Sequence, residues 1–159
     1  MRQKNLDRMI RLAEEFFDVK NDPEQIAVDE SVMQKLRALD PASMGEKSTK
    51  DGPVAWVLVI PTTSALMDEF IGRKISERAL LERTKIGNTY NAVYLCSALV
   101  LPEYRKKGIA KQLTVAAIRD IQKRHRIKHL FYWSFSDEGT GLAESVAKAV
   151  RLPVVQRKS

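Results

Sequence analysis

The chain has 159 residues, of which 44% are apolar and 30% charged, and this length and composition fit one globular domain over residues 1–159. They exclude collagen-like, disulfide-stapled and wholly disordered chains. No apolar run approaches the ~20 residues of a membrane-spanning helix, and the charged opening MRQKNLDR has no signal-peptide core. We therefore expect a soluble protein of the cytoplasm that does not bind membranes.

Positive charge is concentrated in one part of the sequence. Lysines and arginines number 27 against 20 acidic residues, which gives a net charge of +7. The window 105–128 holds nine of the basic residues and a single acidic one, Asp120, so it carries +8 and the rest of the chain −1. A partner with phosphate groups is one interpretation, and a solvated basic helix face is the other.

The first part of the chain is predicted to contain two helices, a loop and a strand. Apolar residues at three-and-four spacing indicate an amphipathic helix over 2–18, and 30–38 fits a second, shorter helix. The polar stretch 41–53 is predicted to be a loop. The run VAWVLVI, residues 54–60, is typical of a strand covered on both faces, and Pro61 is expected to end it.

Helices and strands alternate in the rest of the chain. Residues 62–64 can cap a helix that Gly72 stops, and Ser76 can begin another. Beyond them we predict a strand over 90–101, a helix over about 109–126, a strand over 129–135 and a last helix around 142–150. Such alternation from residue 54 onward predicts an α/β layered domain.

Cysteine and histidine are too few to indicate a metal site. Cys96 is the single cysteine and cannot form an internal disulfide. It lies in an apolar strand with no activating residue beside it in sequence, so a buried structural thiol is favoured over a nucleophile. His125 and His129 would suit two ligands on a helix, but the predicted helix gives way to a strand between them. We expect no metal cofactor.

The stretch ALVLPEYRKKGIAKQL, residues 98–113, has the features of an anion site. A strand ends, a short basic turn follows, and a helix begins near Gly108. Amides of the first helical turn lack intrahelical acceptors, and the helix dipole adds positive charge, so amides from about Lys106 to Ala110 can surround a pyrophosphate. Gly108 allows close approach of the backbone. The alternative is an ordinary strand-to-helix connection with a capping glycine.

The same residues resemble a family motif. The GNAT superfamily, the GCN5-related N-acetyltransferases, has a pyrophosphate motif of Arg or Gln, two variable residues, Gly, one variable residue, then Gly or Ala. The sequence RKKGIA, residues 105–110, matches it, and the preceding Val100, Pro102, Glu103 and Tyr104 look like the family's usual lead-in. The resemblance covers 90–152 well and the first 89 residues poorly. It implies a single α/β domain with a central mixed sheet flanked by helices.

This resemblance implies an acyl-CoA site and divides the domain around it. The strand before the motif and the next strand would diverge and admit the pantetheine arm of acetyl-CoA, with 90–152 as the core that binds it. Residues 1–53 would be a helical part and loop, and 54–89 a strand with two helices in place of the family's strand hairpin. The implied cofactor-binding residues are Val100 for the thioester and pantetheine, Arg105, Lys106, Lys107, Gly108, Ile109 and Ala110 for the pyrophosphate, Lys111 for the 3′-phosphate, and Thr140.

Catalytic residues are harder to assign because the sequence departs from the family. Alignment on Ala143 puts Thr140 at a usual Asn position and Ala147 at the usual position of the tyrosine that protonates departing CoA; Arg151 and Leu152 replace Gly and Phe. The strand 90–101 contains no carboxylate. Tyr94 and Asp137 are the candidates, with a packed aromatic and a turn former as the structural alternatives. Strand alternation predicts that Tyr94 and Ser97 cannot face the same cleft.

The sequence therefore predicts an acyl-CoA-dependent N-acyltransferase that moves an acetyl group from acetyl-CoA directly to an amine of a small molecule or protein. A second hypothesis is a domain of the same fold that binds acyl-CoA without transferase activity, because the usual tyrosine is missing. A third is a nucleic-acid-binding domain, which rests on the charge of residues 105–128 alone and lacks a recognisable nucleic-acid module. The sequence does not indicate an oligomeric state.

Overall fold

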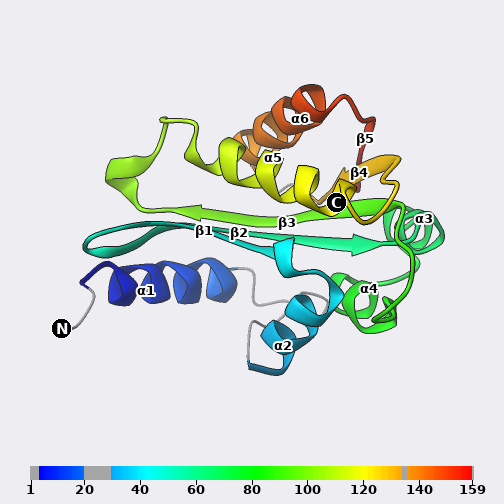
Figure 1. Ribbon diagram of the computed structural model, residues 1–159, viewed down its shortest axis with the longest axis horizontal. Helices are drawn as coiled ribbons and strands as arrows, with labels where there is room; N and C mark the ends of the chain where they lie inside the picture. Colours follow the sequence, from blue (N-terminus) through cyan, green and yellow to red (C-terminus); the bar gives the residue numbers. More distant parts are fainter. Residues whose placement is uncertain (1–3, 20–29, 134–135, 159) are drawn as a thin grey trace.

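The computed structural model describes residues 4–19, 30–133 and 136–158. A five-stranded sheet of order β1-β2-β3-β4-β5 forms the centre of the fold, and Figure 1 shows α5 and α6 on one face with α1, α2 and α4 on the other. The helices are α1 Lys4–Val19, α2 Glu30–Leu39, α3 Ser64–Ile71, α4 Glu77–Arg83, α5 Ile109–Gln122 and α6 Asp137–Val150. The strands are β1 Met44–Thr49, β2 Gly52–Thr62, β3 Ala92–Val100, β4 His129–Tyr132 and β5 Val154–Gln156.

The sheet is mixed, as predicted. β1 pairs with β2 and β2 with β3 in antiparallel fashion, whereas β3–β4 and β4–β5 are parallel. Residues of β2 are almost all buried, which agrees with its continuous apolar sequence. The single-domain α/β architecture with a mixed sheet flanked by helices is confirmed.

The predicted loop over 41–53 is wrong, because β1 occupies most of it. β1 has the sequence MGEKST, which lacks aromatic and branched apolar residues, and its outer edge is exposed. Two contacts with β2 hold it: Trp56 Nε1 donates to Glu46 Oε1 at 2.7 Å, and Gly45 lies so close that an added Cβ would be 2.8 Å from Val57 Cγ2. Pairing with a neighbour, and not local propensity, makes this segment a strand.

The other strands also differ from the prediction at their ends. Pro61 does not end β2, which continues to Thr62. β1 stops opposite Leu58, so Pro61 lies where β2 has no strand on that side, and its missing N–H is tolerated there. β4 ends at Tyr132, and residues 134–135 of the predicted strand lie outside the described residues. The three-residue β5 was not predicted.

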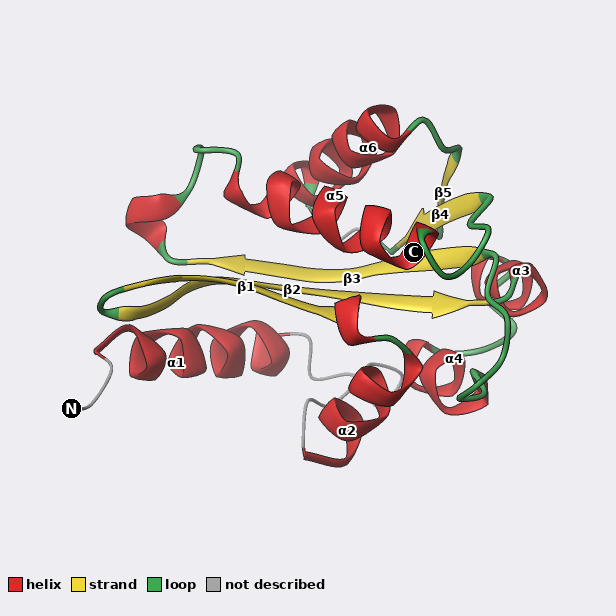
Figure 2. Cartoon of the chain, in the orientation of Figure 1, coloured by secondary structure: helices red, strands yellow, loops and turns green. Residues whose placement is uncertain are grey.

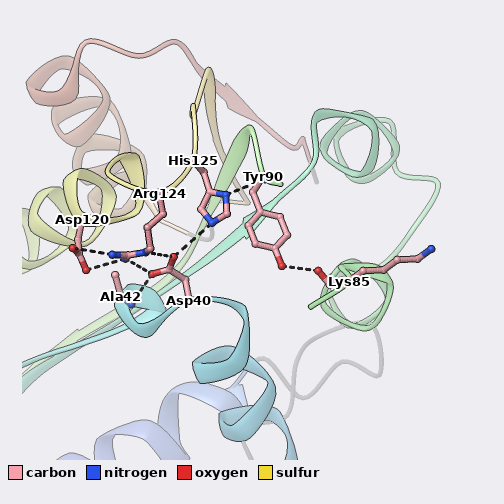
Figure 3. Close-up of polar contacts among 7 residues, drawn as sticks. All are labelled: Asp40, Ala42, Lys85, Tyr90, Asp120, Arg124 and His125. Carbon is pink, nitrogen blue, oxygen red and sulfur yellow. Dashed lines mark hydrogen bonds and ion pairs between the residues drawn. The ribbon is translucent and has the colours of Figure 1, made fainter. Parts of the chain in front are cut away.

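A buried aspartate connects the two halves of the chain (Figure 3). Asp40, at the end of α2, is 2% exposed. Its Oδ1 accepts from the amide of Ala42 at 2.9 Å and from Arg124 Nη2 at 2.6 Å, and its Oδ2 accepts from Arg124 Nε at 3.0 Å. Arg124 also bonds Asp120 one turn earlier, and the two carboxylates raise the pKa of its guanidinium. The forked contact joins α2 to the end of α5.

The end of α6 has an unusual backbone. Arg151 follows the helix with φ 59° and ψ 45°, in the left-handed region, where a side chain is disfavoured and glycine is the common residue. Its amide still closes the helix by donating to the carbonyls of Ala147 and Lys148. The family resemblance places a glycine at this position, so the substitution adds backbone strain that the helix end tolerates.

We expect Asp40→Ala to lower the free energy of unfolding by about 2 kcal/mol, because Arg124 and the Ala42 amide lose their acceptor while the half-exposed guanidinium regains some water. Urea unfolding measures the change. Asp120→Ala is the matched control, because it removes the exposed partner of the same arginine and should cost less than about 0.5 kcal/mol. Equal losses in the two variants would contradict a special role for the buried carboxylate.

We expect Arg151→Gly to raise the free energy of unfolding by about 0.5–1 kcal/mol, because glycine adopts the left-handed conformation without the steric cost. The midpoint of thermal unfolding reports this as a rise of about 2 °C. The same change at exposed Glu144, within α6, should instead cost about 1 kcal/mol. A lower stability of Arg151→Gly would contradict this, because it would mean that the arginine side chain stabilises the fold by more than the backbone strain destabilises it.

Candidate functional site

The site is built on the separation of β3 and β4. Their parallel pairing covers four positions, from Ala92 with His129 to Leu95 with Tyr132. Beyond Leu95, β3 continues to Val100 with a partner on its β2 side only, within the part of the chain that the structure describes. Figure 2 shows the long β3 running past the short β4. The second half of β3 therefore has one free edge inside the sheet.

The hydrogen-bond register identifies the groups on this edge. The amide of Leu101 donates to the carbonyl of Val54 at 2.9 Å, and in an antiparallel pair residues alternate between facing and leaving the partner strand. Val100 and Ala98 therefore point their N–H and C=O away from β2. Consistent with this direction, Val100 O accepts from Arg105 Nε at 2.9 Å. The sequence indicated Val100 but not Ala98.

A β-bulge changes which side chains of β3 share a face. Ser97 pairs with Leu58 and Leu95 with Val59, so Cys96 is an extra residue on β3. Tyr94 pairs with Ile60, two residues from Leu58 on an uninterrupted β2. Tyr94 and Ser97 consequently lie on the same face, and the prediction that strand alternation separates them is wrong. Alternation cannot be extended through a bulge that the sequence does not reveal.

The loop before α5 presents a row of amides. Lys106 and Gly108, on either side of Lys107, both have positive φ, 62° and 78°, and left-handed residues in a turn help to form concave arrays of N–H groups that bind anions. The first bond of α5 runs from Gln112 N to Gly108 O at 2.9 Å, and no side chain caps the helix. The amides of residues 109–111 have no acceptor within the described chain. Gly108 is required by its φ, since an added Cβ would meet only Gln112 Nε2, 4.0 Å away.

Charged residues surround these amides. Arg105, Lys106, Lys107 and Lys111 are all exposed, and Lys107 Nζ lies 5.6 Å from the ring centroid of Tyr104. Ile109 is buried, and Ala110 and Thr140 are half-buried, Thr140 in the first turn of α6. The structure thus brings residues 105–111 together at the end of β3, whereas Thr140 belongs to another helix.

An ion pair fixes the turn that leads into this loop. Glu103, in the single turn of 3₁₀ helix at Pro102–Tyr104, accepts two hydrogen bonds of 2.7 Å from Arg8 of α1. This pairing lowers the pKa of Glu103 to about 2. α1 also packs its buried Met9 against Val54 and Leu101 under the same end of β3. The N-terminal helix therefore supports the strand end and the turn from below.

The two predicted catalytic residues, Tyr94 and Asp137, lie in different environments. Tyr94 is fully buried and its hydroxyl donates to a carboxylate oxygen of Glu77, itself 3% exposed at the start of α4. Burial and the nearby carboxylate raise the pKa of Tyr94. Asp137 is exposed in the first turn of α6, on the other face of the sheet. Ala147, where the family has tyrosine, is buried in the main core.

Sequence reasoning missed a group of residues around Tyr94. Phe70 of α3 contacts the Tyr94 ring edge-on, with centroids 5.0 Å apart. Arg157, just after β5, places its guanidinium carbon 4.5 Å from the ring centroids of both Phe70 and Trp133. These residues come from separate elements, and Arg157 follows a strand that was not predicted, so the sequence carried no signal that they meet.

The chain is similar to some solved structures at low sequence identity. No curated protein matches the chain. Among solved structures, an aminoglycoside acetyltransferase from an uncultured soil metagenomic sample, in complex with sisomicin, is 15% identical over 92% of this chain and 83% of that chain, with a TM-score of 0.48. Aminoglycoside N-acetyltransferase AAC(6')-Iy in complex with CoA is 14% identical over 77% of this chain and 86% of that chain, with a TM-score of 0.40.

Among the described residues, no helix is both long and apolar enough to cross a membrane. No group of three or more His, Cys, Asp or Glu side chains that could hold a metal ion occurs among them.

The family comparison covers most of the chain. The acetyltransferase (GNAT) family matches residues 13–141, a stretch that includes the free edge of β3, the loop 105–111 and the start of α6. The chain belongs to the GNAT family of acetyltransferases.

Proposed function

We propose that the protein transfers an acetyl group from acetyl-CoA to an amine. The observation that carries the proposal is the continuous path from the free edge of β3 into the row of amides at 107–111. A strand edge can bind the amides of pantetheine as it would bind another strand, and the amides at the start of α5 can bind the pyrophosphate. The two features follow each other in the order in which these parts occur in CoA.

The pyrophosphate would lie against the amides of residues 107–111. Two left-handed residues and the uncapped start of α5 supply N–H groups there, and the helix dipole adds to the charge of Arg105, Lys106 and Lys107. Lys111, in the first turn of α5, is the proposed contact of the 3′-phosphate. Thr140 remains a prediction from the family resemblance alone.

From the loop, pantetheine would extend back along β3 past Val100 toward Ala98. Arg105 would give up its bond to Val100 O to the incoming arm. The thioester would then lie between Val100, where the resemblance puts it, and Ala98, whose N–H also points away from β2 toward the space between the separated β3 and β4. An N–H aimed at the thioester oxygen stabilises the negative charge that grows there during attack.

The reaction follows from this placement. The amine nitrogen attacks the thioester carbonyl carbon, the C–N bond forms, and the C–S bond breaks to release CoA as a thiolate. The amine loses one proton and the thiolate takes one up. Because a thiol with a pKa of about 8.5 is a tolerable leaving group, the lack of a tyrosine at Ala147 slows the last step without preventing it.

Calorimetric titration with acetyl-CoA, CoA and 3′-dephospho-CoA tests the cofactor site. We expect saturable binding that Gly108→Ala weakens by about tenfold or more, because a side chain at φ 78° strains the loop by about 1–2 kcal/mol and turns its amides. Gly87→Ala is the matched control: Gly87 has φ 79° and open space around it, so that variant carries the same strain far from the loop and should bind normally.

The outcomes separate the candidate functions. Binding with release of CoA in the presence of amines supports the transferase, and binding without turnover toward any amine supports an acyl-CoA-binding domain. If none of the three ligands binds to the folded protein, the acyltransferase proposal is wrong. The basic residues 105–111 would then be tested against DNA and RNA at varied salt concentration.

Tyr94 and Asp137 are tested by turnover. We expect Tyr94→Phe to lower kcat by about 10²-fold. The Tyr94 hydroxyl lies on the same face of β3 as Ser97, and its hydrogen bond to Glu77 would let it take a proton from the attacking amine while it passes its own proton to the Glu77 carboxylate. Binding of acetyl-CoA should not change. The dependence of kcat on pH distinguishes a lost proton transfer from a packing defect. Tyr90→Phe removes another buried hydroxyl, remote from the gap, and serves as the control.

Asp137→Asn examines the second predicted residue in the same assay, with a much smaller loss of kcat expected. A loss in Asp137→Asn with none in Tyr94→Phe would reverse the assignment. Unchanged kcat in both variants would show that neither residue takes part in proton transfer.

A further inference from the structure

Arg157 is a buried cation with unused hydrogen-bonding capacity. Its side chain is packed on Phe70 and Trp133, and the residue is 5% exposed. The nitrogens Nε and Nη1 have no hydrogen-bond partner among the described residues. Buried guanidinium groups almost always donate to an acceptor, because losing water without replacing its hydrogen bonds is costly. Contact with two rings offsets only part of this cost.

Arg157 lies near the point where β3 and β4 separate, at the end of the site where the thioester would react. Its backbone amide donates to Tyr132 O at 2.8 Å, and Tyr132 is the last residue of β4 paired with β3. Its charge also acts on the Tyr94 hydroxyl, where it opposes the rise in pKa that burial causes. Tyr94 and Ser97 share this face because of the bulge. The group therefore lies beside the point at which β3 and β4 separate.

We define the Arg157 cluster as Phe70, Glu77, Tyr94, Trp133 and Arg157. It combines one buried cation, one buried carboxylate and three aromatic rings from five parts of the chain. Trp133 is half-buried, whereas the other four residues are at most 5% exposed. A ligand of the Arg157 cluster is expected to carry one negative and one positive group. A ligand with only a positive group would leave the Arg157 guanidinium without an acceptor, and a ligand with only negative groups would be repelled by the Glu77 carboxylate.

We propose that Arg157 binds the carboxylate of the acceptor, so that the acetylated amine belongs to an amino acid. The carboxylate would accept hydrogen bonds from the guanidinium, and the ammonium group, before it loses its proton, would face the Glu77 side of the cluster. The rings of Phe70 and Trp133 would contact the carbon skeleton. This inference rests on the proposed function and names the substrate class for the same site.

The test uses substrate pairs that differ only in the carboxylate. The native protein is assayed for CoA release with acetyl-CoA and the twenty common amino acids, and with the amines that correspond to them after decarboxylation, such as leucine with 3-methylbutylamine and phenylalanine with 2-phenylethylamine. We expect kcat/KM to be at least about tenfold higher for the better amino acids than for their amines, as a charge-assisted hydrogen bond provides.

Variants at Arg157 identify the residue responsible. Arg157→Gln should lower the ratio of kcat/KM for an amino acid to kcat/KM for its amine by about 100-fold, because only the amino acids lose a charged partner. Any effect of the lost charge on Tyr94 is common to both members of a pair and cancels in this ratio. Arg157→Lys, which keeps the charge, should restore part of the preference. A defect in packing would instead lower both members of each pair equally.

Binding gives a readout that does not need turnover. With CoA present, amino acids should raise the melting temperature of the native protein and not that of Arg157→Gln, and the amines should raise neither. Equal use of amines and amino acids, equal losses in Arg157→Gln, or no carboxylate-dependent rise in melting temperature would each overturn the inference. Failure of acetyl-CoA to bind, seen separately by calorimetry, would count against the proposed function itself.

Discussion

The whole site depends on where the pairing between β3 and β4 stops. Four residue pairs hold the two parallel strands together, and after Leu95 and Tyr132 the hydrogen-bonding groups of β3 turn toward an open edge. A sheet interior ordinarily satisfies every such group within the chain. In the proposed function the backbone itself would be the binding surface, so specificity for an extended, amide-containing ligand would require few particular side chains.

The rest of the molecule holds this open edge in a fixed shape. β2 pairs with β3 along its length, and α1 covers the end of the strand, tied to the following turn by Arg8 and Glu103. At the other end of α5, Arg124 donates two hydrogen bonds to the carboxylate of Asp40. α5 is thus anchored at its C-terminal end while its N-terminal amides remain free, which is the arrangement an anion site at a helix start needs.

Part of this arrangement could be predicted from sequence because local rules govern it. The apolar run at 54–60, the glycine at 108 and the basic turn before it each reflect a requirement of the adjacent backbone. The polar strand β1 and the short β5 have no such signal, since pairing partners distant in sequence create them. The bulge at Cys96 also has no signal in the sequence, and it places Ser97 on the same face of the strand as Tyr94. Arg157 and Glu77 were missed for the same reason: tertiary contacts alone bring them to Tyr94.

An open strand edge also has a consequence for the behaviour of the protein in solution. Unpaired backbone groups on a strand are a template on which a strand of another molecule can add. The exposed stretch here is short, with Ala98 and Val100 as its outward-facing residues, and Arg105 already bonds the carbonyl of Val100. The guanidinium therefore occupies one acceptor of this edge, and any strand or ligand that pairs there has to compete with it for one hydrogen bond.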